Sequence, residues 1–238
     1  MNRLVLSLWL VTGFLAAGAQ KTINDPEAEK RTVSGFHGIE VSTGIHLLLT
    51  QGNTEEVAVS ASRPEYRDRI ETVVENGVLK IRYKTRTGAI NRIHEDKALR
   101  AYVSCRTLDL LHANTGADIT IEGKLNVPSL EMEANTGAHV TGEFNLDRLR
   151  VDQSTGSKMT LSGQVASMSL EGSTGSKFFG EDLQVNTCEA EVSTGAALFI
   201  RVDKQLNARA STGGYIKYKG EGGLSEVKTS TGGHVSRI

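Results

Sequence analysis

A run of basic side chains in the first half of the chain is the clearest candidate for binding chemistry. Between Val78 and Arg106 the sequence carries eight lysines and arginines against two acids, a local charge of +6 in a chain whose net charge is −1. Some of these bases alternate with apolar residues, which places them on one outward strand face. Such a row would take an anionic polymer, such as an acidic polysaccharide or lipopolysaccharide phosphate. The candidate residues are Lys80, Arg82, Lys84, Arg86 and Arg92.

A plainer interpretation of the same stretch is favoured. Charged residues on a strand commonly keep a sheet edge solvated and protect it from pairing with another chain. Nucleic-acid binding is the weakest alternative, because only Tyr83 and Tyr102 are interleaved with the bases. The net charge of −1 also gives no general attraction to nucleic acid. We therefore expect no nucleic-acid partner.

The remaining polar residues show no pattern typical of catalysis or metal binding. The acids of the second half are dispersed, and no carboxylate pair repeats at matching positions with a base beside it. The six histidines form no H-x-x-x-H motif, and the chain holds no G-x-S-x-G motif. We expect no catalytic residue, no metal and no cofactor, and hence a binding or structural module. An enzyme that cleaves polysaccharides on the same scaffold, a lyase or a hydrolase, is the alternative.

A repeated tripeptide indicates the scaffold. Ser-Thr-Gly or Asn-Thr-Gly occurs seven times in the second half of the chain, at spacings of 18 to 21 residues. Apolar residues occupy alternate positions on both sides of each copy, which is the strand period. A period near 20 residues is typical of stacked repeats. We predict an all-β parallel solenoid with coils of about 19 residues, each strand pairing with the same strand one coil further on.

The tripeptides are predicted to form one corner of every coil. The glycine suits a backbone with positive φ, and a second corner is expected at Gly123, Gly142 and Gly163. The threonines and the Asn or Ser residues before them would form columns that hydrogen-bond from coil to coil. We interpret these columns as structural and not as a binding or catalytic row. The threonines are Thr115, Thr136, Thr155, Thr174, Thr194, Thr212 and Thr231.

The first half of the domain is predicted to cap this stack. Asn76-Gly77 lies between two apolar runs and indicates a hairpin, and Pro64 begins a possible helical turn. Ser42-Thr43-Gly44 separates two strand-like runs, as in the later coils. Antiparallel strands here would protect one open end of the solenoid. The last coil shows no obvious cap, so self-association through the solenoid ends is a further possibility.

The N-terminus has the features of a secretory signal. Arg3 precedes the apolar run Leu4–Leu15, and Ala17-Gly18-Ala19 is a small-residue cleavage site. We predict a signal peptide over 1–19, a polar leader over 20–32 and one domain over 33–238, with the Thr-Gly repeats over 108–238. The protein is expected to be exported to the periplasm, the outer-membrane surface or the extracellular space. No transmembrane segment is expected.

The two cysteines are predicted to be free thiols. Cys105 and Cys188 are separated by four coils, about 19 Å at the spacing between strands. A disulfide needs Cα atoms within about 7 Å. Cys188 falls in an inward column, where we expect it to pack as a small apolar residue.

The chain resembles the family described as "putative auto-transporter adhesin, head GIN domain". The motifs that carry the resemblance are Phe36-x-x-Ile39-x-Val41-x-x-Gly44-Ile45, Leu49-x-Gln51-Gly52, Asn76-Gly77-x-Leu79-x-Ile81 and the serial Thr-Gly turns. It covers the chain from about Val33 to the end. The resemblance implies a right-handed β-helix similar to pectin-lyase-like solenoids. It also implies a role in adhesion, with a polysaccharide or other cell-surface polymer as the partner, and no catalytic residues.

Overall fold

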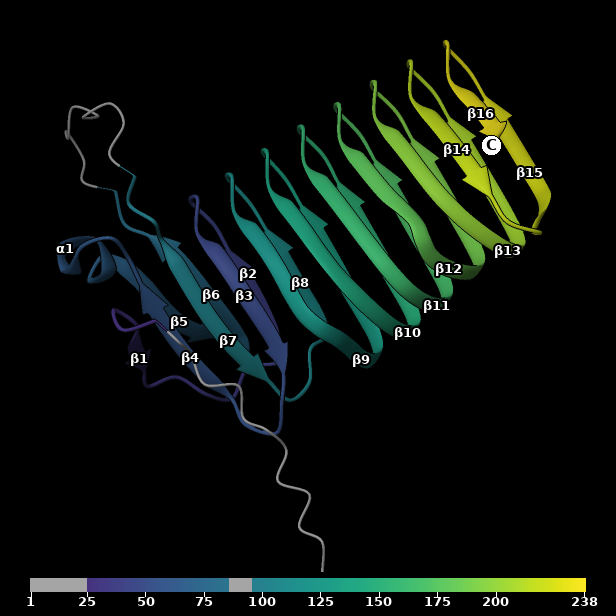
Figure 1. Ribbon diagram of the computed structural model, residues 1–238. Helices are drawn as coiled ribbons and strands as arrows, with labels where there is room; N and C mark the ends of the chain where they lie inside the picture. Colours follow the sequence, from purple (N-terminus) through teal and green to yellow (C-terminus); the bar gives the residue numbers. More distant parts are fainter. Residues whose placement is uncertain (1–24, 86–95) are drawn as a thin grey trace, which may run out of the picture.

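Strands stacked in register make up almost the whole molecule. The computed structural model describes residues 25–85 and 96–238, which form a row of coils with a cap at one end (Figure 1). The predicted signal peptide, the start of the polar leader, Arg86 and Arg92 lie outside the described residues.

The repeats form the predicted parallel solenoid. Val140, for example, is aligned with Ile119 of the coil before and with Met159 of the coil after. We call sheet A the strands that follow each Thr-Gly turn and sheet B the strands that lead to the next turn. The elements of the repeats are β8 (Leu110–Ala113), β9 (Asp118–Ala134), β10 (His139–Gln153), β11 (Lys158–Gly172), β12 (Lys177–Val192), β13 (Ala197–Ala210), β14 (Tyr215–Lys219), β15 (Gly223–Thr229) and β16 (His234–Arg237).

The second corner of the coil differs from the expected turn. The strands β9 to β13 run through this corner without a break, so sheets A and B are parts of one folded sheet. The pairing register shifts there, for instance between Thr160 and Ser162, and such bulges bend a strand sharply. Gly123 and Gly163 have φ of 79° and 106°. Gly142 is not among the residues with positive φ.

The Thr-Gly corner is a backbone ladder. Thr155 has φ of 49° and Gly156 has φ of 70°, so the threonine shares the left-handed conformation that the sequence assigned to the glycine. The Gly156 N–H donates to the Thr174 carbonyl of the next coil at 3.0 Å, and Gly175, Gly195 and Gly213 repeat this bond. The Thr115 hydroxyl donates to the Asn114 side chain, and the Thr155 hydroxyl is hydrogen-bonded to the Ser154 hydroxyl, so both contacts stay within one turn. Backbone groups therefore make the regular coil-to-coil bonds that were expected of the side-chain columns, while in the Asn/Ser column the Ser154 hydroxyl donates to the Asn135 side chain of the coil before.

The N-terminal coils are stacked out of chain order. The coil that turns at Thr43 lies between two later segments, because β2 pairs with both β6 and β8, and β3 pairs with both β7 and β9. The antiparallel strands β4 and β5 then cover the outer edges of β7 and β6, which confirms the predicted cap. The cap elements are β1 (Glu29–Arg31), β2 (Gly38–Val41), β3 (His46–Gln51), β4 (Glu56–Ser60), α1 (Pro64–Arg67), β5 (Ile70–Glu75), β6 (Val78–Tyr83) and β7 (Arg100–Cys105).

Inward columns of apolar side chains form the core between the two sheets. Phe144 and Phe178 are among the largest fully buried side chains, with 0% exposure. The predicted columns are buried through most of the stack, but Val227 of the last coil is 43% exposed. This difference arises because β15 lies at the end of the stack and pairs only with β13 among the described strands.

The predicted free thiols are confirmed. Cys105 and Cys188 are both buried and unpaired. Burial raises the pKa of the Cys105 thiol to about 11 and that of the Cys188 thiol to about 12. Because the thiolate is the reactive form, both side chains act as small apolar core residues at neutral pH.

Candidate binding surface

The predicted basic strand is β6, and its charges are largely compensated. β5 and β6 form the predicted hairpin around Asn76-Gly77. Arg82 Nε lies 2.5 Å from Glu71 Oε2, and Lys84 Nζ lies 2.7 Å from Glu71 Oε1. Lys80 Nζ lies 2.8 Å from Glu75 Oε2. The three described members of the predicted site are therefore all paired with acids of the neighbouring strand.

The titration of these groups reflects the same contacts. Hydrogen bonds from Lys84 and Arg82 lower the pKa of Glu71 below its ordinary value. A hydrogen bond from Lys80 lowers the pKa of Glu75, and the same contact raises the pKa of Lys80. The acids thus stay ionised beside the bases, and β6 presents little net charge to a polyanion. Anionic-polymer binding by this strand remains a prediction.

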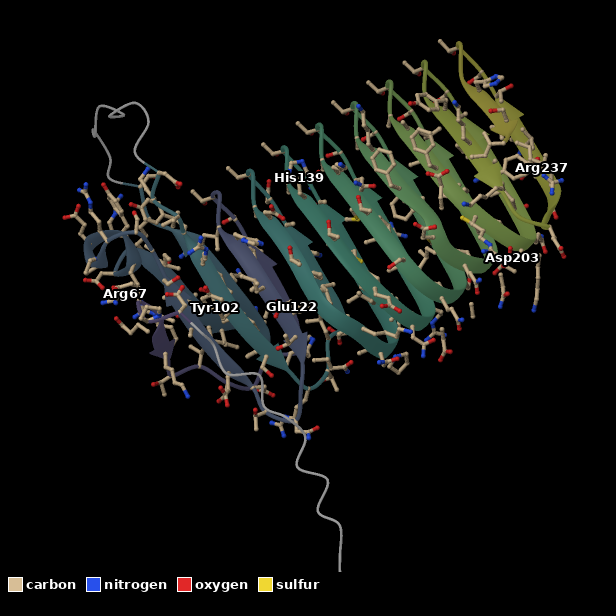
Figure 2. The ribbon with its side chains drawn as sticks, viewed as in Figure 1. Arg67, Tyr102, Glu122, His139, Asp203 and Arg237 are labelled. Atoms are coloured by element: carbon tan, nitrogen blue, oxygen red, sulfur yellow. The ribbon has the colours of Figure 1, made fainter. Side chains whose placement is uncertain are left out.

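A second outward surface lies on sheet A. In each coil the third and fifth residues after the turn threonine point away from the core, and they line up from coil to coil. Figure 2 shows His139, in the third position of its coil, together with Glu122 on this face. We call these lines the third-position row and the fifth-position row. The third-position row is Asp118, His139, Lys158, Lys177, Ala197, Tyr215 and His234, and the fifth-position row is Thr120, Thr141, Thr160, Phe179, Phe199, Lys217 and Ser236.

Three aromatic rings meet on these rows. The Phe179 and Phe199 rings are parallel, at 3°, with centroids 5.2 Å apart. The Tyr215 ring meets Phe199 edge-on, with centroids 5.8 Å apart. Because 5.2 Å exceeds the thickness of two touching rings, roughly 3.5 Å, the parallel pair is offset. All three side chains are half-buried, so part of each ring is open to solvent. We call Phe179, Phe199 and Tyr215 the aromatic row.

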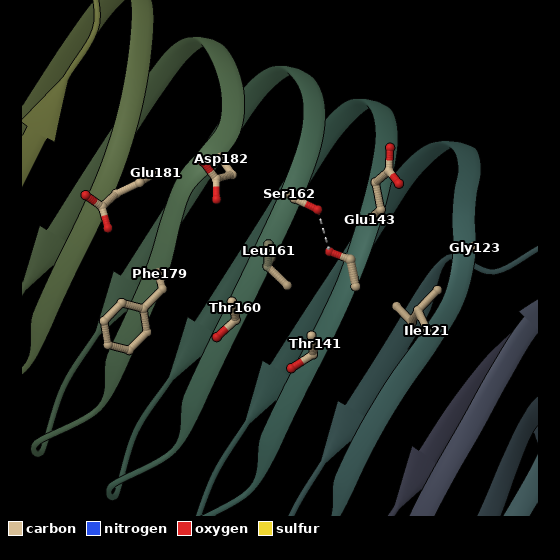
Figure 3. Close-up of a pocket in the computed structure, with 11 residues that line it drawn as sticks. Ile121, Gly123, Thr141, Glu143, Thr160, Leu161, Ser162, Phe179, Glu181 and Asp182 are labelled. Atoms are coloured by element: carbon tan, nitrogen blue, oxygen red, sulfur yellow. Dashed lines mark hydrogen bonds between the residues drawn. The ribbon is translucent and has the colours of Figure 1, made fainter.

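A groove beside Phe179 runs along the stack, between the fifth-position row and the second corner (Figure 3). It has a volume of about 460 Å³. Phe179, Thr160 and Thr141 lie along one side of it, and Glu143, Ser162 and Asp182 lie along the other (Figure 3). Glu143 forms an ion pair with Lys124 at 2.8 Å, and the Ser162 hydroxyl donates to the Gly142 carbonyl at 3.4 Å. The groove thus combines an aromatic wall with hydroxyl and carboxylate groups.

This combination is suited to polar ligands with apolar faces. Pockets that bind such ligands pair aromatic side chains with a few polar groups that fix orientation. Across residues 25–85 and 96–238, no group of three or more His, Cys, Asp or Glu side chains is placed to hold a metal ion. The chemistry on offer is therefore stacking, hydrogen bonding and ion pairing.

The residues of this surface were not predicted, because they occupy the outward positions between the apolar inward columns that define the coils. Phe179 and Phe199 occupy the same outward position of neighbouring coils, and two large apolar residues at such a position are a usable signal. Tyr215 gives no such signal, because it sits in the third-position row and reaches Phe199 only through its side-chain geometry.

Parallel coils with an exposed aromatic face define the molecule as a parallel β-solenoid with a candidate binding surface. The sequence profile described as "putative auto-transporter adhesin, head GIN domain" matches residues 35–222. The chain belongs to this family. Membership assigns it an adhesin-type role and indicates an exported or cell-surface protein. Within the described part of the chain, no helix has the length and apolarity to span a bilayer.

Solved structures share the fold. A putative adhesin from Bacteroides fragilis is 17% identical, with a TM-score of 0.76 over 89% of this chain and 96% of that chain. A putative lipid binding protein from Parabacteroides distasonis is 17% identical, with a TM-score of 0.70 over 91% and 98%. A putative adhesin from Parabacteroides merdae is 15% identical, with a TM-score of 0.69 over 89% and 95%. No curated protein matches the chain.

Proposed function

We propose that the protein is a non-catalytic adhesion module that binds glycan chains of a cell-surface polymer on sheet A. The aromatic row is the observation that carries the proposal. The C–H groups on one face of a sugar ring carry partial positive charge, and the face of an aromatic ring carries partial negative charge. A half-buried ring is held in place by the sheet, so it binds at low cost in side-chain entropy.

The repeat geometry supports a polymeric ligand. Coils follow one another at about 4.8 Å along the stack, so the same contact recurs at a constant interval. Thr141 and Thr160 continue the fifth-position row beyond Phe179 and offer hydroxyl groups to the next sugars. Weak contacts to successive units of one chain add up through multivalency. We include in the proposal that residues 1–19 direct export to the periplasm, the outer-membrane surface or the extracellular space.

The experiment is a glycan array followed by calorimetry with the polymer that binds. Replacing Phe179 and Phe199 together by alanine is expected to weaken binding about tenfold or more, as for central aromatic contacts in other interfaces. Leu48→Ala is the matched control, because Leu48 is also half-buried and aligns with Thr120 in the same row. Unchanged affinity of the double variant, or no glycan bound by the wild type, would contradict the proposal.

The groove carboxylates favour a second candidate, an enzyme that cleaves polysaccharides. Glu181 and Asp182 both line the groove beside Phe179, and paired carboxylates are the groups that glycoside hydrolases use. Release of shortened chains from a bound polymer, abolished in the Glu181→Gln and Asp182→Asn variants, would establish this candidate. Binding without chain shortening would leave the adhesion module as the function.

We also propose that the molecule self-associates through the end formed by β15 and β16. Among the described residues, the exposed large apolar side chains are all in this last part of the chain: Leu224 at 45%, Val227 at 43% and Ile238 at 58%. Exposed strand edges with apolar residues pair readily with another chain, and lysines on the edge prevent it. The Leu224→Lys, Val227→Lys variant is expected to elute as a monomer where the wild type elutes as a dimer. A wild type that is monomeric at all concentrations would overturn this proposal.

A further inference from the structure

The aromatic row is accompanied by lysines that carry uncompensated charge. Lys158, Lys177, Lys217 and Lys219 all belong to sheet A, and within the described part of the chain none of them forms an ion pair. On the neighbouring positions Lys124 is paired with Glu143 and Arg201 with Asp203. The free charge on this face is therefore concentrated around the rings.

Charge is divided across sheet A. From the coil of Thr136 to the coil of Thr231, the third-position and fifth-position rows hold Lys158, Lys177 and Lys217 and no acid. The carboxylates Glu181 and Asp182 lie on the other side of Phe179, towards the second corner. A ligand on the rings thus meets cations on the side of the Thr-Gly corner and acids on the side of the groove.

The ammonium groups lie next to the ring faces. Lys158 Nζ is 5.2 Å from the Phe179 centroid, and Lys217 Nζ is 6.0 Å from the Phe199 centroid. Attraction between the cation and the ring holds each flexible side chain near the stacking surface. A sugar stacked on these rings would place its substituents within reach of the ammonium groups.

We propose that the polymer bound by sheet A is an acidic polysaccharide. Its sugar rings pack against the solvent-exposed parts of Phe179, Phe199 and Tyr215 along the axis of the solenoid. Its carboxylate or sulfate groups pair with Lys158 and Lys177 on the side of the Thr-Gly corner and with Lys217, which follows Phe199 in the fifth-position row. The inference rests on the proposed glycan-binding function and adds the charge class and the orientation of the ligand.

The electrostatic part of binding has a predictable size and salt dependence. An exposed ion pair changes affinity by about two- to fivefold, so three lysines together account for about tenfold or more. Salt screens charges of this kind, with a Debye length of about 8 Å at physiological ionic strength. Binding is therefore expected to weaken as salt is raised, while the stacking contribution persists.

The test compares three polymers: polygalacturonate, the same polymer with its carboxyl groups reduced to alcohols, and heparin. Polygalacturonate carries carboxylates, heparin carries sulfates together with carboxylates, and the reduced polymer keeps the sugar backbone without charge. Calorimetry at low and high salt is expected to show tight, salt-sensitive binding to at least one acidic polymer and binding about tenfold or more weaker to the neutral chain.

Two variants, each lacking three basic side chains, test whether the acidic polymer binds on sheet A or on β6. Lys158→Gln, Lys177→Gln, Lys217→Gln is expected to lose about tenfold or more of the affinity for the acidic polymer. Lys80→Gln, Arg82→Gln, Lys84→Gln removes the same number of charges from the ion-paired strand β6 and is expected to bind like the wild type. Circular dichroism checks that both variants keep the fold.

Three other outcomes would contradict the acidic ligand, the location of the site or the proposed function itself. Equal binding to acidic and neutral chains, lost in the Phe179→Ala, Phe199→Ala variant, would overturn the acidic ligand and leave the glycan-binding function standing. A larger loss in the β6 variant would move the site to the cap. No binding to any glycan would overturn both the inference and the proposed function.

Discussion

Replacing Gly163 by alanine is expected to destabilise the solenoid far more than the same replacement of Gly123. Both glycines have positive φ at the second corner, 106° and 79°. A Cβ atom at Gly163 would lie 2.0 Å from the Phe144 carbonyl oxygen, whereas a Cβ atom at Gly123 would meet nothing within 4 Å. The obstacle at Gly163 is backbone of the paired coil, which cannot turn aside as a side chain can.

This comparison separates the cost of a left-handed backbone from the cost of the clash with the neighbouring coil. The left-handed conformation alone costs alanine roughly 1–2 kcal/mol, and this is the expected loss for Gly123→Ala. Gly163→Ala must also displace the Phe144 peptide. This variant is therefore expected to lose more than about 4 kcal/mol of unfolding free energy. Urea unfolding followed by circular dichroism measures both. Equal losses would show that backbone conformation, and not the close approach of the coils, makes glycine necessary at this corner.

Phe178 and Phe179 are expected to give opposite results in stability and binding. Phe178 is fully buried, and Phe179 is half-buried on the outer face with its ring against Phe199. Phe178→Ala leaves a cavity in the core and should cost about 3–5 kcal/mol of unfolding free energy. Phe179→Ala loses a partly exposed aromatic contact, worth about 0.5–1.5 kcal/mol beyond its buried area.

Glycan affinity should follow the reverse order. Phe179→Ala is expected to weaken binding, while a Phe178 variant that remains folded should bind normally. Phe178→Leu keeps most of the core volume, at a cost of about 1.5 kcal/mol or less, and so provides a folded control. Denaturant unfolding and calorimetry on the same samples check both halves. Equal effects of the two residues on binding would contradict the outward assignment of Phe179.

Much of the fold follows from local sequence. Strand period, turn residues and a constant spacing were enough to predict the coils, the Asn76-Gly77 hairpin and the separation of the two cysteines. The order of the N-terminal coils was not predictable in this way. The pairing of β2 with both β6 and β8 depends on contacts between segments far apart in the chain, and no local pattern records them.

The candidate site was harder to predict than the scaffold. The basic strand was identified from charge within one stretch of sequence, but Glu71 and Glu75 lie just before that stretch. The predicted hairpin already places Glu71 opposite Arg82. The strand register of the hairpin was therefore enough to predict that an acid neutralises this base. The lysines around the aromatic row come from three different coils, and only the stacking of the coils brings them together.

The exchanged order of the first coils has a mechanical consequence. An open solenoid loses its coils one at a time from either end, since each coil contacts only its neighbours. Here the coil of β2 and β3 is held on both sides by strands that come later in the chain. Tension on the N-terminal end cannot unwind it without breaking its pairings with β6 and β7 on one side and with β8 and β9 on the other. We therefore expect the capped end to resist unravelling, and the coils to be lost first at β15 and β16.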